Sequence, residues 1–447
     1  MAPRIIEPKN SRQAPTGPHS KEWREAMGAK IKALESRNTW VLVDRAAVKG
    51  RRILSSKWVF RVKTASDGTI EQFKARWVVH GYEQRHEIDF DQTFAPLSCH
   101  TSVRIFLAIA ATRHLLLRQI DVKNAFLYAL VDDVIYVEQS HTYGEEDSGV
   151  CQLRKSLYGI KQAPGLWQQY LLNILPPDPG MYHRDSRGEY ILLMVYVDGL
   201  LYTGSSNELL EQFEKNLAGC VDITCNHDLK QFLGLNITFS LEAIHLSAAK
   251  YAEELGKRFN IAHAPLSTPY RTPGPNHKPD NKALSPDGLQ TYQKQLGCLL
   301  FASITCNPDL SYIASQLAQY LRKPTAENLS DLKRALQFFI STPNVGLCYS
   351  TIPAASFNLI GYMDADHAAD PDNRRSRPGF LFRLEPNGPI SWNSQNQELV
   401  ALSSAEAECI AATAAVRENH EKSGLEELSP ALRRLERSQN REQTWVR

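Results

Sequence analysis

The stretch YILLMVYVDGLLYTG, residues 190–204, decides how the chain folds, because it places one aspartate between two apolar runs. The pair Asp198-Gly199 is typical of a two-residue turn that joins adjacent strands. The stretch therefore predicts a buried β-hairpin with Asp198 at its tip. An aspartate in such a turn is most often only a turn former. A carboxylate beside an apolar hairpin loses hydration, and this costs free energy unless the carboxylate binds a partner. A functional role for Asp198 is therefore the alternative.

A second aspartate is predicted at the end of a neighbouring strand. Helical spacing behind Thr101 and Ser102 predicts a helix over residues 101–117 that packs beneath a sheet. Residues 115–122 are then predicted to form a strand that ends at Asp121. On adjacent strands, Asp121 and Asp198 would repel each other unless they shared a divalent cation. Mg²⁺, with Mn²⁺ as the alternative, suits oxygen ligands and phosphate, so both aspartates are candidate catalytic metal ligands.

A hairpin with one basic face is predicted upstream of these aspartates. Residues 57–63 and 73–79 alternate apolar and cationic side chains, and Asp67-Gly68 lies between them as a turn. The cations of this basic hairpin are Lys57, Arg61, Lys63, Lys74 and Arg76. The usual interpretation is a solvated strand face. The alternative is a lid whose cations bind a triphosphate and a nucleic-acid backbone, and the charge pattern alone favours neither.

The C-terminal third holds a second candidate site. Residues 357–363 are predicted to form a strand that delivers Asp364. Ser403 and Glu406 have the spacing of a capping box, which opens a helix with Glu408 in its first turn. A strand aspartate that faces a helix glutamate suits a metal-dependent hydrolase of phosphodiesters. Taken alone, Glu408 is better explained as an acid that complements the helix dipole.

Composition limits the class of protein. A chain of 447 residues is long enough for about three domains. The formal net charge is only +2, so affinity for nucleic acid must come from local basic surfaces. The 8 cysteines form no Cys-x-x-Cys pair, which argues against zinc and for reduced thiols. No signal peptide and no apolar run of about 20 residues is present, so we expect an intracellular protein, cytoplasmic or nuclear, without membrane contact.

Eight blocks of the sequence resemble, in the same order, the reverse transcriptase and ribonuclease H region of copia-type retrotransposon Pol polyproteins. They are KWVFRVK (57–63), FKARWVVHGYEQ (73–84), DFDQTFAPL (89–97), QIDVKNAFL (119–127), LRKSLYGIKQAP (153–164), FLGL (232–235), GYMDADHAAD (361–370) and ISWNSQNQELVALSSAEAE (390–408), in addition to the hairpin around Asp198. The resemblance implies an RNA-directed DNA polymerase with a magnesium-dependent nucleotidyltransferase mechanism. Its partners would be an RNA template, a DNA primer or RNA–DNA hybrid, and dNTPs.

The same resemblance implies an α+β fold: a right-hand polymerase with fingers, palm and thumb/connection, followed by a truncated ribonuclease H-like α/β domain. The corresponding boundaries are a flexible lead over residues 1–19, fingers and palm over 20–247, thumb and connection over 248–350, a partial ribonuclease H-like domain over 351–420 and a divergent charged tail over 421–447. The thumb region shows helical patterns at residues 250–259 and 326–339, separated by a Pro-rich span.

Residue roles follow from the resemblance and not from spacing. Asp121 and Asp198 match the palm metal ligands, and Asp364 and Glu408 match the first two ribonuclease H carboxylates. Positions that match nucleotide contacts are Lys74, Arg76, Phe126 and Gln162. Positions that match primer and template contacts are Lys57, Arg61, Gly159, Lys161, Phe232 and Gly234.

Several departures from the family pattern point to a weakened copy. Gly199 stands where the family has the second aspartate of its Tyr-Val-Asp-Asp hairpin. The third ribonuclease H carboxylate is not found, and the sequence after Glu418 is unlike the family. Cys99 and His367 replace a usual arginine and tryptophan. The sequence therefore supports a weakened reverse transcriptase, or alternatively a silent relic or domesticated nucleic-acid-binding protein.

Overall fold

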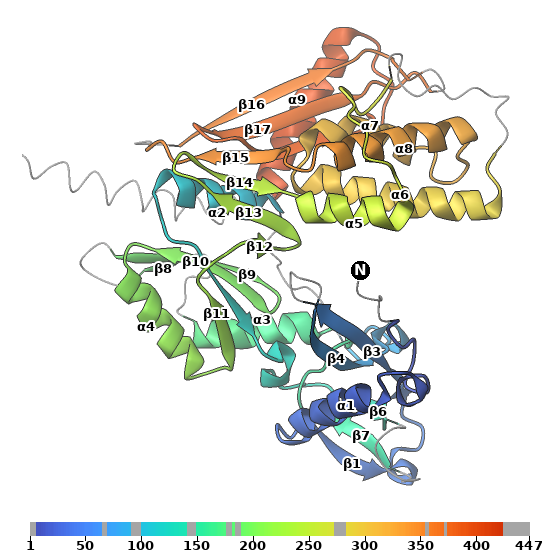
Figure 1. Ribbon diagram of the computed structural model, residues 1–447, viewed down its shortest axis with the longest axis vertical. Coiled ribbons are helices and arrows are strands. Elements are labelled where there is room, and N and C mark those ends of the chain that lie inside the picture. Colours follow the sequence, from blue (N-terminus) through green and yellow to red (C-terminus); the bar gives the residue numbers. More distant parts are fainter. Residues whose placement is uncertain are drawn as a thin grey trace, which may run out of the picture.

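A computed structural model describes residues 6–64, 69–90, 100–140, 149–175, 181–183, 189–271, 283–353, 357–370 and 373–422. These residues form two parts, one above the other in Figure 1. The lower part contains the N-terminal segments and a five-stranded sheet, and the upper part contains the later helices and two further sheets. The mixture of helices and mainly antiparallel sheets agrees with the predicted α+β class. None of the described helices has the length and apolar character that crossing a membrane requires.

The basic hairpin forms as predicted, from β3 (Ser56–Thr64) and β4 (Ile70–Val79). Its apolar face is buried against α1 (Ser20–Glu35), where the Trp23 ring lies 5.2 Å from the Phe60 ring. Arg61 lies opposite Lys74 and Val59 lies opposite Arg76, so these cations share the other face. The predicted turn Asp67-Gly68 lies outside the described residues. A small sheet completes this region in the order β1 (Trp40–Asp44), β7 (Gly149–Leu153), β6 (Tyr136–Glu138) and β2 (Ile53–Leu54).

The N-terminal lead, for which the sequence predicted flexibility over residues 1–19, contacts the basic hairpin. From Ile6 onward it is described, and it includes the short helix η1 (Ala14–Thr16), in which Ala14 is fully buried. Glu7 accepts a hydrogen bond from the Val62 backbone N–H at 3.0 Å and pairs with Arg61 at 3.2 Å. The Glu7 carboxylate thus satisfies a backbone donor of β3 and holds this part of the lead against the basic hairpin.

The central sheet has the order β11 (Ile223–Asn226), β5 (Arg118–Val122), β10 (Gly199–Gly204), β9 (Tyr190–Tyr196) and β8 (Met181–His183), and all its pairings are antiparallel. The predicted hairpin is therefore confirmed as β9–β10. Its turn is not Asp198-Gly199, however, because Gly199 already pairs with Tyr196. The two loop residues are Val197 and Asp198, and Val197 takes the positive φ of 56°. The helices α3 (Ala163–Ile174) and α4 (Asn207–Ala218) and the short helix η4 (Ala125–Tyr128) flank this sheet.

The helix α2 (His100–Thr112) ends five residues before the predicted end at 117. His114 adopts a left-handed φ of 52°, the Leu115 N–H donates to the Ala110 carbonyl, and the His114 N–H donates to the Ala111 carbonyl. This is the Schellman pattern that ends a helix and satisfies its last carbonyls. Thr101 and Ser102 lie inside the first turn, so the predicted cap at these residues is wrong.

The upper part joins a second sheet to helices. Its strands are β12 (Gln231–Phe232), β13 (Leu235–Phe239), β14 (Ala243–Ser247) and β15 (Gly346–Ser350), in that order. Its helices are α5 (Ala249–Phe259), α6 (Pro286–Thr305), α7 (Ser311–Ala318) and α8 (Ala326–Ser341), with the short helix η5 (Pro308–Leu310). The helical patterns at 250–259 and 326–339 are thus confirmed as α5 and α8, whereas α6 and α7 were not predicted individually.

The last region is a three-stranded sheet in the order β16 (Asn358–Ala365), β17 (Pro378–Glu385) and β18 (Pro389–Ser394), covered by α9 (Ser404–Lys422). The buried Arg104 of α2 ties this region to the rest. Its guanidinium donates to the carbonyls of Thr305 at 3.1 Å and Ile390 at 2.8 Å. It also lies 3.9 Å from the centre of the Trp392 ring, a cation–π contact. One side chain therefore links α2, α6 and β18.

A close backbone contact, here called the crossing, attaches the basic hairpin to the loop that contains Tyr158 and Gly159. The Val79 N–H donates to the Tyr158 carbonyl at 2.9 Å. A Cβ on Gly159, whose φ is +105°, would lie 2.0 Å from the Val79 carbonyl oxygen, and one on Gly81 would lie 2.0 Å from the Gly159 oxygen. Only glycine allows the two segments to approach this closely. The crossing thus fixes where the cations of β4 lie.

We predict that Gly159→Ala destabilises the N-terminal part by about 2–4 kcal/mol, because it adds both a backbone clash and conformational strain. Thermal melting followed by tryptophan fluorescence measures the effect, since Trp23, Trp58 and Trp77 are buried in this part. Gly50→Ala is the matched control, because Gly50 also has a positive φ of +84° but has nothing within 4 Å of the methyl group that alanine would add. Equal losses in both variants would contradict the importance of the crossing.

Candidate active site

The strand register brings the two predicted aspartates together. β5 and β10 pair with Asp121 directly opposite Gly199, and the Val122 N–H donates to the Asp198 carbonyl at 2.9 Å. Burial raises the pKa of Asp121, and the negative charge of Asp198 raises it further. The sequence prediction that these carboxylates lie close together is therefore confirmed in the fold.

The turn that carries Asp198 is held from the neighbouring elements. The indole N–H of Trp167, on α3, donates to the Val197 carbonyl at 2.5 Å. The Tyr158 hydroxyl lies 3.5 Å from Asp198 Oδ2. Burial and the charge of Asp198 raise the pKa of Tyr158 to about 12, so this phenol stays protonated and can donate. A β-branched residue at positive φ is uncommon and is often found at functional sites, which fits the role of Val197 in this turn.

Gly199 is neither strained nor crowded. Its φ is not positive, because the turn residues are Val197 and Asp198 and Gly199 already belongs to β10. The nearest atom to a Cβ built on Gly199 is the Tyr196 carbonyl oxygen at 3.5 Å, an ordinary contact. Directly paired residues place their side chains on the same face of a sheet. A side chain at this position would therefore start without a clash, on the same face of the sheet as Asp121.

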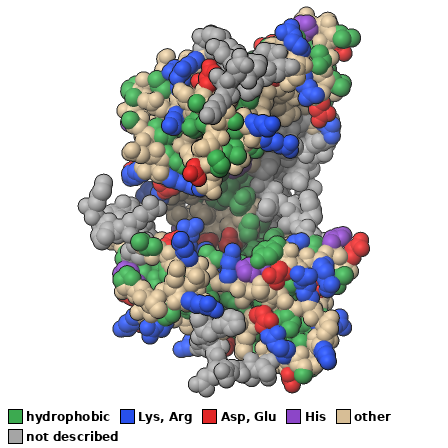
Figure 2. Space-filling view, turned by 90° about the vertical axis from the view of Figure 1, so that its right-hand side faces the viewer, with side chains coloured by type: hydrophobic (Ala, Val, Ile, Leu, Met, Phe, Trp, Pro, Cys, Tyr) green, Lys and Arg blue, Asp and Glu red, His purple; other side chains and the backbone are tan. Residues whose placement is uncertain are grey.

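Cations of the basic hairpin face the two carboxylates. Burial lowers the pKa of Lys74, with Arg76 and Lys63 adding to the decrease, while the charges of Asp121 and Asp198 oppose it. Lys74 is thus close enough to interact with both acids. In the side view, the molecule is hollowed between its lower and upper parts, and acidic and cationic side chains lie along the lower edge of this hollow (Figure 2).

Sequence reasoning missed Lys30 of α1, which belongs to the same cationic cluster. Burial lowers the pKa of Lys30 to about 8, and the nearby charges of Lys74 and Arg76 contribute. Its ammonium donates to Asn124 Oδ1 at 2.6 Å. The signal available in the sequence was weak: Lys30 flanks the buried stripe of α1, three residues after Met27. Nothing in the local pattern indicated that α1 would lie against the basic hairpin.

Phe126 and Gln162 lie near this centre but are largely enclosed by protein. Phe126 is 7% exposed, and its ring meets the Tyr158 ring edge-on at 4.6 Å. The buried Gln162 amide donates to the Asp89 carbonyl at 3.1 Å and to Asp133 Oδ2 at 3.2 Å, and it accepts from Gln84 at 3.0 Å. Gln162 therefore supports the loop, and a direct nucleotide contact stays a prediction for both residues.

The positions matched to primer and template contacts are spread over several surfaces. Lys57 is exposed, while Arg61 is paired with Glu7. The exposed Lys161 places its ammonium 4.5 Å from the Phe90 ring centre. Phe232 is buried in the turn region of the β12–β13 hairpin, in which Leu233 and Gly234 have positive φ values of 51° and 80°. Two positive φ values fit a type I′ turn, and Gly234 lines a hollow of about 430 Å³.

The donor set at the first site fits a hard divalent cation. Asp121 and Asp198 supply carboxylate oxygens only, which Mg²⁺ prefers. Burial and the charge of Asp198 raise the pKa of Asp121, while the charges of Lys74, Lys63 and Arg76 lower it. In the described part of the chain, no third metal-ligating side chain joins this pair.

The second candidate site is less complete. Glu408 Oε1 accepts a hydrogen bond from the Ala365 N–H at 3.3 Å, so it lies beside the strand that carries the exposed Asp364. The predicted capping box forms in part: Ser403 caps the Glu406 N–H at 3.1 Å, but Glu406 reaches the Leu402 N–H instead of the Ser403 N–H. Among the described residues no further carboxylate joins Asp364 and Glu408. The pair does not fit a two-metal hydrolase, which requires more ligands.

Comparison with known proteins agrees with these features. Residues 37–272 match the family described as reverse transcriptase (RNA-dependent DNA polymerase). The chain is 35% identical over 433 residues to the Retrovirus-related Pol polyprotein from transposon TNT 1-94 of Nicotiana tabacum, covering 91% of this chain and 32% of that protein. It is 36% identical over 397 residues to the corresponding polyprotein from transposon RE1 of Arabidopsis thaliana, covering 86% and 27%. The chain therefore spans about a third or less of these polyproteins.

A putative transposon Ty5-1 protein of Saccharomyces cerevisiae is 32% identical over 312 residues, which covers 67% of this chain and 99% of that protein. A solved foamy viral protease–reverse transcriptase in complex with double-stranded DNA aligns with a TM-score of 0.49 at 12% identity, covering 90% of this chain and 61% of the other. The matched family and these sequence relatives show that the chain belongs to the reverse transcriptase family of copia-type retrotransposon Pol polyproteins.

Proposed function

We propose that the chain is an RNA-directed DNA polymerase whose activity is weakened or lost through Gly199. Its substrates would be an RNA template, a DNA primer or RNA–DNA hybrid, and dNTPs. The observation that carries the proposal is the β5–β10 register, which brings Asp121 and Asp198 together. The positively charged Lys74 interacts electrostatically with both carboxylates. Reverse transcriptases generally use divalent metal ions, and we propose that Asp121 and Asp198 hold Mg²⁺, or Mn²⁺ in its place. Bound ions of this kind activate the primer hydroxyl and stabilise the pyrophosphate leaving group.

The side chains of this protein supply binding and orientation. Lys74 and Arg76 lie half-buried on the face turned to the carboxylates, where they would neutralise the triphosphate of an incoming nucleotide. Tyr158 donates toward Asp198 and so orients that carboxylate. Phe126 packs on Tyr158, which is consistent with a proposed role as the gate against a ribose 2′-hydroxyl. Lys30 adds a further cation to the same cluster.

Gly199 is the reason we propose weak activity. An aspartate opposite Asp121 would add a negative charge and two oxygen ligands to the metal site, and glycine supplies neither. The remaining pair should bind Mg²⁺ less tightly and stabilise the developing charge less well. Since the Asp364–Glu408 pair also lacks ligands, the proposed function includes no ribonuclease H activity.

The second candidate function is nucleic-acid binding without catalysis, as in a silent relic or a domesticated protein. One observation favours it: the basic hairpin and the close backbone contact at Gly81 and Gly159 are both formed. In contrast, among the described residues no third metal-ligating side chain joins either pair of carboxylates. The two functions share the binding surface and differ only in chemistry. Primer extension therefore separates them, and binding measurements test what they have in common.

We predict that Gly199→Asp raises metal-dependent dNTP incorporation on a primed poly-ribonucleotide template by at least about tenfold, equivalent to about 1.4 kcal/mol of transition-state stabilisation. A Cβ at this position makes only an ordinary contact, so we expect the gain to come from charge and ligation. Gly199→Asn is the matched control, because it has the same shape without the charge. Asp198→Asn added to Gly199→Asp should abolish the gain. Robust wild-type synthesis that Gly199→Asp leaves unchanged would contradict the weakened-enzyme proposal.

We also predict salt-sensitive affinity for an RNA–DNA hybrid even in the absence of synthesis. When no nucleotide is bound, Lys74 and Arg76 are free to contact phosphates of the hybrid, and each such contact contributes about 1 to the slope of log affinity against log salt. Replacing both residues by Gln should therefore reduce this slope by about 2. Fluorescence anisotropy at several salt concentrations measures the slope. The control replaces Lys49 and Arg51, two exposed cations outside the hairpin, by Gln. An unchanged slope in the first variant would remove the binding role of the hairpin.

A further inference from the structure

A cluster of three metal-ligating side chains lies in the lower part, away from both carboxylate pairs. Glu214 comes from α4, Cys225 from β11, and His227 follows β11 directly. One ligand atom from each of the three residues lies within 4.8 Å of the other two. Among the residues that the structure describes, this is the one group of at least three such side chains with this spacing.

The cluster lies on the opposite face of the central sheet from Asp121. Cys225 pairs with Ile120, and Tyr202 pairs with Arg118, so Cys225 and Tyr202 share the face of the even-numbered residues of β5. α4 packs on this face through contacts with β10 and β11. Asp121 points to the other face, since successive strand residues alternate. The cluster is therefore separate from the candidate active site, although the same strand supports both.

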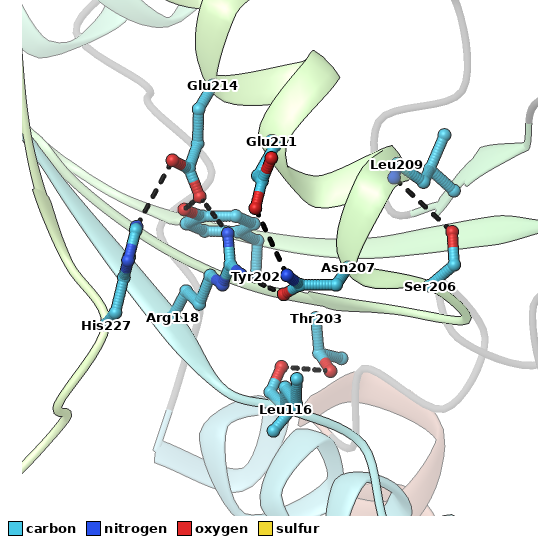
Figure 3. Close-up of polar contacts among 10 residues, drawn as sticks. All are labelled: Leu116, Arg118, Tyr202, Thr203, Ser206, Asn207, Leu209, Glu211, Glu214 and His227. Atoms are coloured by element: carbon cyan, nitrogen blue, oxygen red, sulfur yellow. Dashed lines mark hydrogen bonds and ion pairs between the residues drawn. The ribbon is translucent and has the colours of Figure 1, made fainter.

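The two oxygens of Glu214 have different partners, as Figure 3 shows. Oε1 accepts from Arg118 at 2.5 Å and from the Tyr202 hydroxyl at 2.6 Å. Oε2 lies 3.2 Å from His227 Nε2. Arg118 is itself held by Asn207. The donors on Oε1 fix the orientation of the carboxylate and direct Oε2 toward the imidazole, which is how outer hydrogen bonds orient a metal ligand.

The chemistry of the three ligands selects the metal. A carboxylate oxygen, an imidazole nitrogen and a thiolate sulfur form a mixed set that suits Zn²⁺, whereas Mg²⁺ prefers oxygen alone. Ligands about 2.0–2.3 Å from a tetrahedral Zn²⁺ are about 3.3–3.8 Å from one another, so the 3.2 Å separation of Oε2 and Nε2 needs little adjustment. The His227 side chain is 54% exposed, which leaves an open side for a water molecule as fourth ligand.

We propose that Glu214, Cys225 and His227 bind one Zn²⁺ ion, and that this ion fastens β11 to α4 behind the strand that carries Asp121. β11 is the edge strand of the central sheet, and its Thr224 is paired with Asp121. A zinc ion here would stabilise the edge that supports the catalytic strand. The inference does not depend on whether the chain catalyses DNA synthesis.

The sequence has no Cys-x-x-Cys pair, which argues against a zinc site built from paired cysteines. It says nothing about a site with a single cysteine. The proposed ligands are of three types, and Glu214 is 11 residues before Cys225 in the numbering. They meet only because α4 packs back on the strand that follows it. The competing explanation is an ion-pair network without metal, in which Arg118 neutralises Glu214 and His227 is a peripheral partner. The two explanations differ in whether Cys225 becomes a metal-bound thiolate.

Co²⁺ titration of the full chain, stripped with a chelator and kept reduced, tests the proposal. We expect about one equivalent of bound Co²⁺ with a thiolate-to-cobalt charge-transfer band, and displacement of the ion by Zn²⁺. Cys225→Ser should remove the band, and His227→Ala should weaken binding strongly. Cys220→Ser is the matched control, because Cys220 is an exposed free cysteine near the same helix and outside the cluster. Asp121→Asn should leave the band unchanged.

A second variant separates ligation from a folding defect. Tyr202→Phe keeps the buried ring but removes the hydroxyl that holds Glu214 Oε1, so we expect affinity for Zn²⁺ to fall about tenfold with the charge-transfer band preserved. Circular dichroism confirms that each variant is folded. No band in the wild-type chain, or a band that survives Cys225→Ser in folded protein, would overturn the proposal in favour of the metal-free network.

Discussion

The pairing register of β5 with β10 is the constraint on which the rest of the molecule depends. It sets Asp121 opposite Gly199 and brings the Asp198 backbone within hydrogen-bond distance of Val122. A slip of one residue would turn Asp121 into the apolar face and Arg118 away from Glu214, because strand side chains alternate with a period of two. The register is fixed by the buried residues Ile120 and Leu200, which are paired with each other and fully enclosed. Core packing therefore determines where the carboxylates lie.

The remaining elements position charge around that register. Trp167 of α3 binds the Val197 carbonyl in the turn. The close backbone approach at Gly81 and Gly159 fixes the position of β4 relative to the loop at Gly159. As a result, three half-buried cations, Lys30, Lys74 and Arg76, lie close enough to perturb one another. Such crowding of like charges is unfavourable in the free protein. A bound polyanion would relieve it, which makes the basic hairpin a natural place for phosphate.

The sequence predicted those features that depend on alternation and helical period. The basic hairpin, the strand at Asp121 and the hairpin at Asp198 formed because each buries one regular apolar face. Details of backbone geometry were less accessible: the turn uses Val197 and Asp198 instead of Asp198 and Gly199, and α2 stops at a left-handed His114. Contacts between distant segments could not be read from local patterns. The contacts of Glu7 with β3, the place of Lys30 and the Glu214–Cys225–His227 cluster all arise from packing between elements.

The most direct test is to map the metal site with Fe²⁺, which binds oxygen-ligand sites and, with ascorbate and peroxide, cleaves the nearby backbone. The experiment uses protein that carries both Cys225→Ser and His227→Ala, which removes two of the three proposed zinc ligands and leaves the oxygen-ligand sites intact. We expect cuts at the end of β5 near Asp121, in the turn at Asp198 and in β4 near Lys74, all suppressed by excess Mg²⁺ and by Asp198→Asn. Cuts confined to the region of Asp364, or cuts at Asp121 that persist in Asp198→Asn, would contradict the claim that the β5–β10 register builds the metal site.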